Sequence, residues 1–384
     1  MSALPSISIV IPNWNGAEHL PECLSSVGAL DYPQDRFEVI VVDNGSTDGS
    51  RTLIDRLQPR VRLIANEKNL GFAAACNLGA QAATSDCVAF LNNDMRVDRR
   101  WLRELAAAYD RTAGYVCVAG VILDWDGDHL DFGGGWVNFH AYAGQSHFGA
   151  PLDEARIEDG RDLPFACGGS MLVDRAVMLE LGGFDPAYFA FFEDVDFGWR
   201  LWLAGYKVRL AGRARSFHRH HGTASAIPLH QRELLYERNA LFTLIKNVSD
   251  DNLATLLAPT LFLLLERCRL GLESAPGPFA IGTFADAPTE AVARVGLAPL
   301  HAACEVLESL PQLLERRREV QRRRKRDDEE IFALFGRPFA RVADDERYQK
   351  ASAALRDLFG LDELLSPRRR RHSLQRRFSR VARQ

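Results

Sequence analysis

The stretch FEVIVVDNGSTD, residues 37–48, decides the fold class of this sequence. Residues 37–42 form a mostly apolar, β-branched run, which is typical of a strand buried on both faces of a sheet. The next six residues are polar or glycine, and Ser46 or Thr47 is suited to cap a helix that runs to about Leu57. A buried strand that ends in a polar loop and continues into a helix is the repeating unit of a parallel α/β sheet.

The same unit occurs on both sides of this stretch. Further strands are predicted at residues 7–11, 61–65 and 87–91, and further helices at residues 20–30 and 71–83. These alternating elements predict an α/β fold with a mainly parallel sheet covered by helices on both faces. From Leu229 onward the pattern becomes helical, which predicts a helical C-terminal region.

Polar clusters follow the predicted strands, at residues 13–15, 43–48, 66–69 and 92–94. In open α/β sheets, ligands bind outside the carboxyl ends of the strands. The clusters therefore predict a ligand site at that edge. The sequence has neither a glycine-rich dinucleotide fingerprint after the first strand nor a P-loop, so a bound nucleotide would be held in another way.

Charge is distributed unevenly along the 384 residues. The net charge is -4, yet the last 19 residues contain eight arginines and no acid, so the rest of the chain is strongly acidic. An acidic body argues against a nucleic-acid partner. The basic tail, residues 366–384, and the basic segments 316–318 and 322–326 suit contact with anionic lipid, with a solvated helix face and a disordered tail as the alternative.

Compartment and membrane features point to a cytoplasmic protein, with the inner face of the membrane as a second location. The seven cysteines show no metal or redox spacing and predict reduced, buried thiols. The apolar run at residues 7–11 is too short for a signal peptide, and residues 253–265 are fewer than the roughly 20 needed to span a bilayer. The latter run predicts a buried or membrane-surface helix.

Six segments, in this order, resemble glycosyltransferase family 2. They are residues 8–16 (SIVIPNWNG), 41–50 (VVDNGSTDGS), 69–77 (NLGFAAACN), 90–94 (FLNND), 182–185 (GGFD) and 192–196 (FEDVD). The resemblance covers roughly residues 6–225, and its branch is similar to rhamnosyl- and galactofuranosyl-transferases. It implies a Rossmann-like GT-A fold, a UDP- or dTDP-sugar donor, and transfer with inversion to a hydroxyl.

The resemblance implies a donor site at the strand ends. Asp43 can accept hydrogen bonds from a base or a ribose, and the family pattern implies base recognition; a helix-capping loop is the alternative. Glycine near Cys167 permits close backbone approach to a ligand. The expected donor-binding residues are Pro12, Asn13, Trp14, Asn15, Asp43, Gly71, Asn77, Asn93 and Gly169.

The metal site is expected after the fourth strand. Asn92-Asn93-Asp94 stands at the place of the family's Asp-X-Asp motif and keeps only the last carboxylate. Hard oxygen ligands suit Mg²⁺ or Mn²⁺, so Asp94 is the expected ligand. His218 is expected to complete the site, while His220 and His221 are alternative ligands or phosphate contacts.

The catalytic base is expected in the segment Glu193-Asp194. Inverting transfer needs one base on the acceptor side, and the family pattern implies Asp194 in that role. The alternative is that these acids only favour the first turn of a helix. Aromatic rings stack on sugar faces, so Phe191, Phe192 and Trp199, together with Glu193, are the expected acceptor contacts; core packing is the alternative for each ring.

We therefore expect a catalytic domain at residues 1–228, with a nucleotide half at 1–120 and an acceptor half at 121–228, followed by a helical region at 229–365 and the basic tail. The expected function is transfer of a hexose or deoxyhexose to a glycan or lipid-linked glycan in cell-surface polysaccharide synthesis. The processive Gln-X-X-Arg-Trp motif is missing from the sequence, which favours addition of one or a few sugars. A non-catalytic scaffold with a degenerate site is the alternative function. The helical region could pack on the catalytic domain, cover the acceptor groove or form a homo-oligomer.

Overall fold

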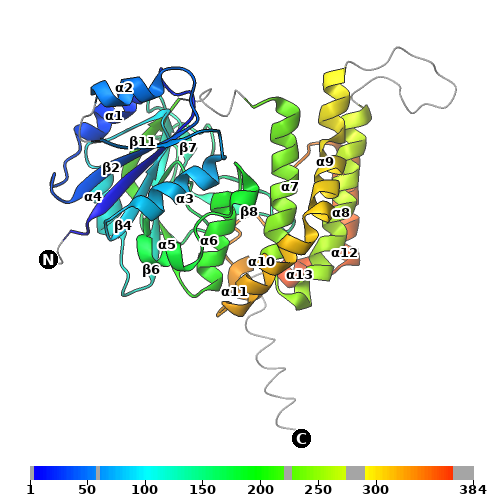
Figure 1. Cartoon of the computed structure of the whole chain (residues 1–384). Helices are drawn as coiled ribbons and strands as arrows, with labels where there is room; N and C mark the ends of the chain where they lie inside the picture. The colour runs from blue at the N-terminus through cyan, green and yellow to red at the C-terminus, as the bar shows by residue number, and fades with distance from the viewer. Residues whose placement is uncertain (1–3, 58–60, 220–226, 274–289, 366–384) are drawn as a thin grey trace, which may run out of the picture.

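The computed structural model describes residues 4–57, 61–219, 227–273 and 290–365. A twisted sheet with helices on both faces lies beside a group of long helices from the second half of the chain (Figure 1). The α/β class followed by a helical region is thus as predicted. The seven cysteines are free thiols, and five of them are buried.

The first half of the sheet is parallel. Its order is β3-β2-β1-β4, and β1 pairs with both β2 and β4. The chain therefore moves outward from β1 in one direction and then crosses to its other side, which opens a crevice at the carboxyl ends of the strands. The elements are β1 (Ile7–Asn13), α1 (Leu20–Gly28), β2 (Phe37–Asn44), α2 (Ser50–Leu57), β3 (Val61–Asn66), α3 (Phe72–Ala82) and β4 (Cys87–Leu91).

The second half makes the sheet mixed instead of mainly parallel. Strand β10 lies antiparallel between β4 and β6, whereas β11 runs parallel to β6 and carries β5 antiparallel at its far edge. The pairing of β11 with β5 sets His218 opposite Met95, next to Asp94. The elements are β5 (Met95–Val97), α4 (Trp101–Ala108), β6 (Tyr115–Asp124), β7 (Leu130–Phe132), β8 (Gly135–Val137), β9 (Ala143–Gln145), β10 (Ser170–Asp174), α5 (Arg175–Glu180), η1 (Pro186–Tyr188), α6 (Glu193–Leu203) and β11 (Lys207–His218).

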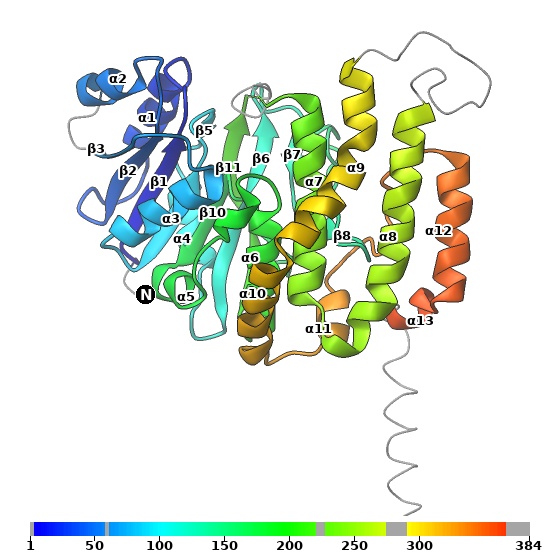
Figure 2. The same cartoon turned by 45° about the vertical axis from the view of Figure 1, so that its right-hand side comes forward.

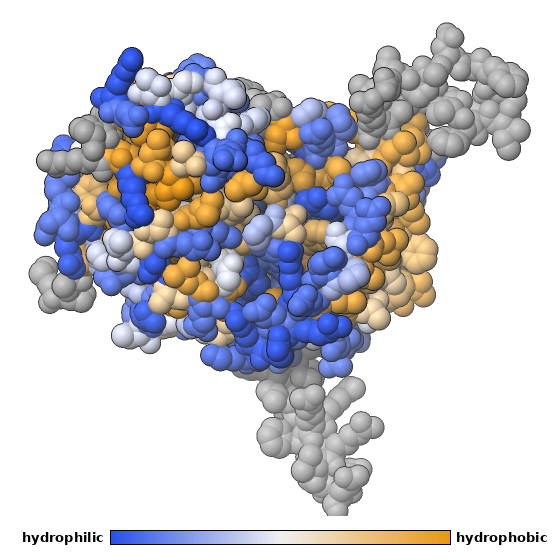
Figure 3. Space-filling model, in the orientation of Figure 1, coloured by the Kyte–Doolittle hydropathy of each residue, from blue (hydrophilic) through white to orange (hydrophobic). Residues whose placement is uncertain are grey.

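The helical region stands against the sheet domain through α7, which packs on α6 and on the later helices (Figure 2). Hydrophobic surface gathers at the right of the molecule in Figure 3, and Phe262 and Leu265 of α8 and Leu300 of α9 are among the exposed apolar residues. Even so, no helix in the described ranges is long and apolar enough to cross a membrane. The helices are α7 (Leu229–Asn247), α8 (Asp250–Glu273), α9 (Glu290–Glu308), α10 (Leu310–Arg322), α11 (Asp328–Phe332), α12 (Glu346–Leu358) and α13 (Leu361–Leu365).

Three arginines of the predicted basic segments are largely buried and form hydrogen bonds inside the protein. Arg317 donates to the carbonyls of Ile245 and Val248, Arg324 donates to the carboxylate of Asp328, and Arg326 donates to the carbonyls at the end of α6. Their side chains are 7%, 15% and 16% exposed. The expectation of lipid contact or a solvated face is therefore wrong for these three residues. The tail, residues 366–384, lies outside the described residues.

Lys246 of α7 joins the two parts of the molecule. It is 1% exposed, and its Nζ lies 2.8 Å from Asp185 Oδ2 and 2.9 Å from Asp196 Oδ1. Because Lys246→Met leaves buried carboxylates short of a partner, we expect the free energy of unfolding to fall by about 3–5 kcal/mol in urea denaturation. Lys350→Met is the control, since Lys350 pairs with Glu346 in water at 75% exposure and should change stability little. Equal losses in the two variants would contradict this account.

Candidate active site

A cleft of about 950 Å³ lies at the carboxyl ends of the strands, between the sheet domain and α7. Residues from the first half of the chain, the 189–194 segment and β11 all reach it. Most of the predicted site residues line this cleft, although they are up to 206 positions apart in the sequence: Pro12, Asn13, Trp14, Gly71, Asn93, Asp94, Gly169, Phe191, Phe192, Glu193, Asp194 and His218.

A chain of hydrogen bonds crosses three neighbouring strand ends behind the cleft. Asp43 Oδ2 accepts from Asn13 Nδ2 at 3.0 Å, and Asn13 Oδ1 accepts from Asn93 Nδ2 at 2.7 Å. Burial raises the pKa of Asp43, but hydrogen bonds from Ser46, Arg51 and Asn13 outweigh that and lower it below its usual value. Asp43 is fully buried and does not line the cleft. It fixes Asn13 and, through Asn13, Asn93, while its expected contact with a base stays a prediction.

Two other residues that were predicted to bind the sugar donor hold loops instead of lining the cleft. Asn77 donates to the carbonyl of Phe184 at 2.7 Å and accepts from the Phe184 N–H at 2.9 Å, which ties α3 to the 182–185 turn. Asn15 has a left-handed φ of 50°, and its Oδ1 accepts from the Thr47 N–H at 2.8 Å. Neither residue lines the cleft, and direct contact of Asn15 and Asn77 with a sugar nucleotide stays a prediction.

Trp199 lies in the core of the protein. It is 4% exposed, and its ring meets Phe335 edge to face at 5.2 Å. The expected acceptor contact of Trp199 is corrected by this placement, since the ring is on the side of α6 that faces the C-terminal segment. The sequence pattern after Asp194 predicts a helix, but it does not predict the direction in which the Trp199 ring points.

Asp94 and His218 meet at the edge of the cleft. Asp94 Oδ2 lies 3.6 Å from His218 Nε2, and Asp94 Oδ1 is buried with no hydrogen-bond partner among the described residues. Burial lowers the pKa of His218, but hydrogen bonds to Asp131 and Asp94 outweigh it and raise the pKa to about 10. An open carboxylate oxygen beside an imidazole nitrogen fits a divalent cation, whose binding would displace the imidazole proton.

The protein offers two ligands here and not a complete cage. In the ranges that the structure describes, no group of three or more His, Cys, Asp or Glu is arranged to hold a metal ion. A diphosphate oxygen and water would have to supply the other positions, as is common for Mg²⁺. His220 and His221, the alternative ligands, lie outside the described residues.

Asp131 of β7 orients His218 and was not predicted. Its Oδ2 lies 2.7 Å from His218 Nδ1, its Oδ1 accepts from Gln145 Nε2 at 3.2 Å, and it is 3% exposed. This bond leaves His218 Nε2 directed at Asp94. An acid between Leu130 and Phe132, in an otherwise apolar strand, is the sequence signal that could have found it.

Asp131→Asn is expected to weaken Mn²⁺ binding by about 10–100-fold, because the outer partner of a ligating histidine fixes the ring and raises its basicity. Binding is measured by electron paramagnetic resonance titration of Mn²⁺ in the presence of UDP. Asp128→Asn, at an exposed position in the same hairpin, is the control. Wild-type Mn²⁺ affinity in Asp131→Asn would show that the histidine needs no such support.

The acid pair is presented to the cleft by a strained turn. Phe189, Phe191 and Phe192 have left-handed φ values of 63°, 69° and 64°, and α6 begins immediately afterwards. Asp194 Oδ2 accepts from the Gly168 N–H at 2.9 Å, which fixes the carboxylate toward the cleft wall. Gly71 permits the close fit, because a Cβ there would lie 2.6 Å from the Phe189 carbonyl oxygen.

Burial separates the two acids chemically. Burial and the neighbouring Asp194 charge raise the pKa of Glu193 well above its usual value. Burial also raises the pKa of Asp194, but backbone N–H groups of Gly168 and Val195 act in the opposite direction. The backbone N–H groups that donate to Asp194 favour its ionised form, and no N–H group of another residue is found at the Glu193 carboxyl among the described residues. This division suits Asp194 as a base and Glu193 as a hydrogen-bond donor.

Aromatic rings form the wall beside the acid pair. Phe191 and Phe192 lie 4.8 Å and 5.8 Å from Tyr236 of α7, and Tyr142 lies 6.0 Å from Phe192. Tyr142 and Tyr236 line the cleft and were not predicted. The helical region thus supplies part of the cleft, which the sequence alone left open.

Comparison with known proteins agrees with these features. Residues 8–182 match the model of glycosyl transferase family 2. The chain is 30% identical over 134 residues to glycosyltransferase AglE of Haloferax volcanii, covering 34% of this chain and 41% of that protein. It is 28% identical over 222 residues to an N-acetylglucosaminyl-diphospho-decaprenol L-rhamnosyltransferase of Mycobacterium tuberculosis, covering 52% of this chain and 71% of that protein.

A solved structure supports the fold. GalNAc-T7, determined with UDP, GalNAc and Mn²⁺, aligns with a TM-score of 0.52 at 17% identity, over 81% of this chain and 58% of that one. This likeness, together with the sheet order, confirms the GT-A-like α/β fold. The chain spans less than half of AglE and about seven tenths of the rhamnosyltransferase.

Proposed function

We propose that this chain, whose residues 8–182 match the model of glycosyl transferase family 2, moves a sugar from a nucleoside diphosphate sugar to a hydroxyl of a glycan or lipid-linked glycan, with inversion. The observation that carries the proposal is the meeting of Asp194 with the Asp94–His218 pair in one cleft. Its placement in cell-surface polysaccharide synthesis is supported by relatives such as the decaprenol-linked rhamnosyltransferase.

The donor lies at the strand ends in this proposal. Asn13, Trp14 and Asn93 contact the nucleotide or sugar, and Gly71 and Gly169 let the donor approach the backbone closely. Asp94 and His218 hold a divalent cation, which neutralises charge on the diphosphate when bound. The UDP and Mn²⁺ found with GalNAc-T7 support this ligand class.

The acceptor lies on the side of Asp194. Its hydroxyl gives a proton to an oxygen of Asp194 while its own oxygen forms the new bond to the anomeric carbon. The bond from that carbon to the diphosphate oxygen breaks, and the nucleoside diphosphate leaves with the electron pair. Glu193 and the rings of Phe191, Phe192 and Tyr236 hold the acceptor sugar.

A panel of UDP-, dTDP- and GDP-sugars with Mn²⁺ or Mg²⁺ tests the proposal. Released nucleoside diphosphate is measured with water as the acceptor, so no glycan need be known. We expect release from one donor that stops when EDTA is added. Neither binding nor release across the panel would favour the scaffold alternative, in which the two asparagines of Asn92-Asn93-Asp94 mark a degenerate site.

A further inference from the structure

The turn before the acid pair needs support from outside itself. Phe189, Phe191 and Phe192 carry side chains, yet all three adopt left-handed backbone conformations within four positions. Such conformations are unfavourable for bulky residues and persist only where the surroundings enforce them. One support comes from α3, whose Ala73 N–H donates to the Phe189 carbonyl at 3.3 Å, and others come from α7 in the helical region.

Asn239 of α7 is the residue that reaches this turn. It has no exposed surface, and its Nδ2 lies 3.1 Å, 2.9 Å and 2.7 Å from the carbonyl oxygens of Tyr188, Ala190 and Phe191. Its Oδ1 accepts from Arg238 Nε at 3.1 Å, which fixes the orientation of the amide. The two amide hydrogens are thus shared among three carbonyls of the strained turn, the last of them three residues before Asp194.

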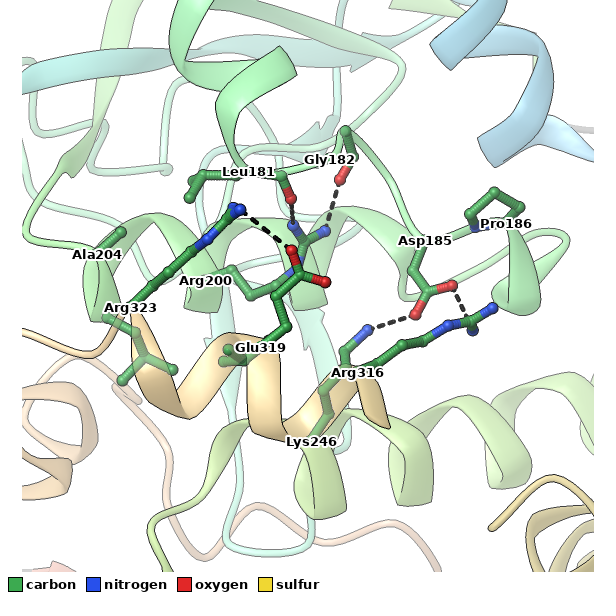
Figure 4. Close-up of a pocket in the computed structure, with 13 residues that line it drawn as sticks. Leu181, Gly182, Asp185, Pro186, Arg200, Ala204, Lys246, Arg316, Glu319 and Arg323 are labelled. Atoms are coloured by element: carbon green, nitrogen blue, oxygen red, sulfur yellow. Dashed lines mark hydrogen bonds and ion pairs between the residues drawn. The ribbon is translucent and has the colours of Figure 1, made fainter. Parts of the chain in front are cut away.

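Other contacts from the helical region hold the two ends of the same segment. Lys246 and Arg316 both bind Asp185, beside a small cavity of about 170 Å³ (Figure 4). Asn247 Nδ2 donates to Asp196 Oδ1 at 2.9 Å, just after the acid pair. Between these ends, Asn239 holds the Ala190 and Phe191 carbonyls, while the Ala73 N–H of α3 holds the Phe189 carbonyl.

We propose that Asn239 is a positioning residue for Asp194: it holds the left-handed turn that aims the carboxylate at the acceptor side of the cleft. The inference rests on the proposed role of Asp194 as base. Without the amide, residues 189–192 can relax toward ordinary backbone angles, and the start of α6 turns with them. The helical region is then part of the catalytic machinery and not only a wall of the cleft.

Asn239→Ala tests the inference, with release of nucleoside diphosphate from the donor that the panel identifies as the readout. We expect kcat to fall about 100-fold, because small misplacement of a reacting group is costly. The donor dissociation constant should change less than about twofold, since Asn239 does not line the cleft. Thr243→Val is the matched control: the Thr243 hydroxyl accepts from the Tyr188 hydroxyl and donates to the Asn239 carbonyl, so the change removes two buried hydrogen bonds but none to a carbonyl of the turn. Its kcat should fall less than about threefold.

A double-mutant cycle separates positioning from general loss of structure. In the Asp194→Asn background, adding Asn239→Ala should lower the residual rate less than about threefold, because the group that Asn239 aims is already gone. The same 100-fold loss in both backgrounds, or an equal loss in Thr243→Val, would overturn the inference. Asn239→Ser, which keeps one donor, replaces Asn239→Ala if that variant does not fold; a loss of kcat as small as that of Thr243→Val would then overturn it.

The two proposals fail in different ways. If Asp194→Asn keeps the wild-type kcat, Asp194 is not the base, and Asn239 then has no base to position. If Asp194→Asn has a much lower kcat while Asn239→Ala keeps nearly the wild-type kcat, only the positioning role of Asn239 is refuted.

Discussion

Asp194→Asn is expected to lower kcat for nucleoside diphosphate release by about 10²–10⁴-fold, the usual contribution of a general base. The donor dissociation constant should stay within about twofold, because the proposed role of Asp194 is contact with the acceptor and not with the donor. Glu193→Gln is the matched comparison, since burial disfavours the ionised form of that carboxyl and an amide closely replaces its neutral form. A deeper loss in Glu193→Gln than in Asp194→Asn would reverse the assignment of the two acids.

The same assignment fixes the direction of the pH dependence. A base acts only when it is ionised, so the rate falls as the pH drops through the pKa of Asp194. Burial raises that pKa above the usual 3.8, so the acidic limb of the kcat profile should lie above the ordinary aspartate range. The limb should be missing from the residual activity of Asp194→Asn.

Asp94→Ala is expected to lower the rate of donor turnover by about 10³-fold, because a metal ion that neutralises the diphosphate is worth several kcal/mol in the transition state. The buried Oδ1 of Asp94 has no partner among the described residues, so its removal takes away a ligand and no internal hydrogen bond of that atom. Mn²⁺ binding should fall in parallel.

Asp98→Asn is the control for Asp94→Ala. Asp98 is exposed, lies four residues along the same edge of the sheet and accepts from the Arg100 N–H, a bond that asparagine can keep. Both variants are compared by donor release and by Mn²⁺ titration. Full turnover in Asp94→Ala with unchanged Mn²⁺ dependence would remove Asp94 from the metal site.

The first half of the sheet could be read from the sequence because its strands are continuous apolar runs bounded by turn residues. The strand predicted at residues 87–91 has the bounds of β4, and the other three are extended by one or two residues into their polar loops. The antiparallel placement of β10 could not be read, since strand direction depends on pairing between distant segments and not on local pattern.

The position of the cleft could be predicted from the sequence, but most of the contacts within it could not. Strand ends locate Asn13, Asn93 and Asp94, but not which polar atoms are already used inside the protein, as in Asp43 and Asn77. Asp131 and Asn239 could not be found from the sequence, because their hydrogen-bond partners lie 87 and 48–51 positions away along the chain. Lipid contact through the tail and homo-oligomer formation stay predictions.

The anomeric configuration of the first product tests the central claim most directly. The donor found in the panel is hydrolysed by the protein, and the sugar is followed by proton nuclear magnetic resonance before its anomers equilibrate. One base and direct displacement of the diphosphate predict a first-formed sugar of inverted configuration. A first-formed sugar that retains the donor's configuration would contradict the account.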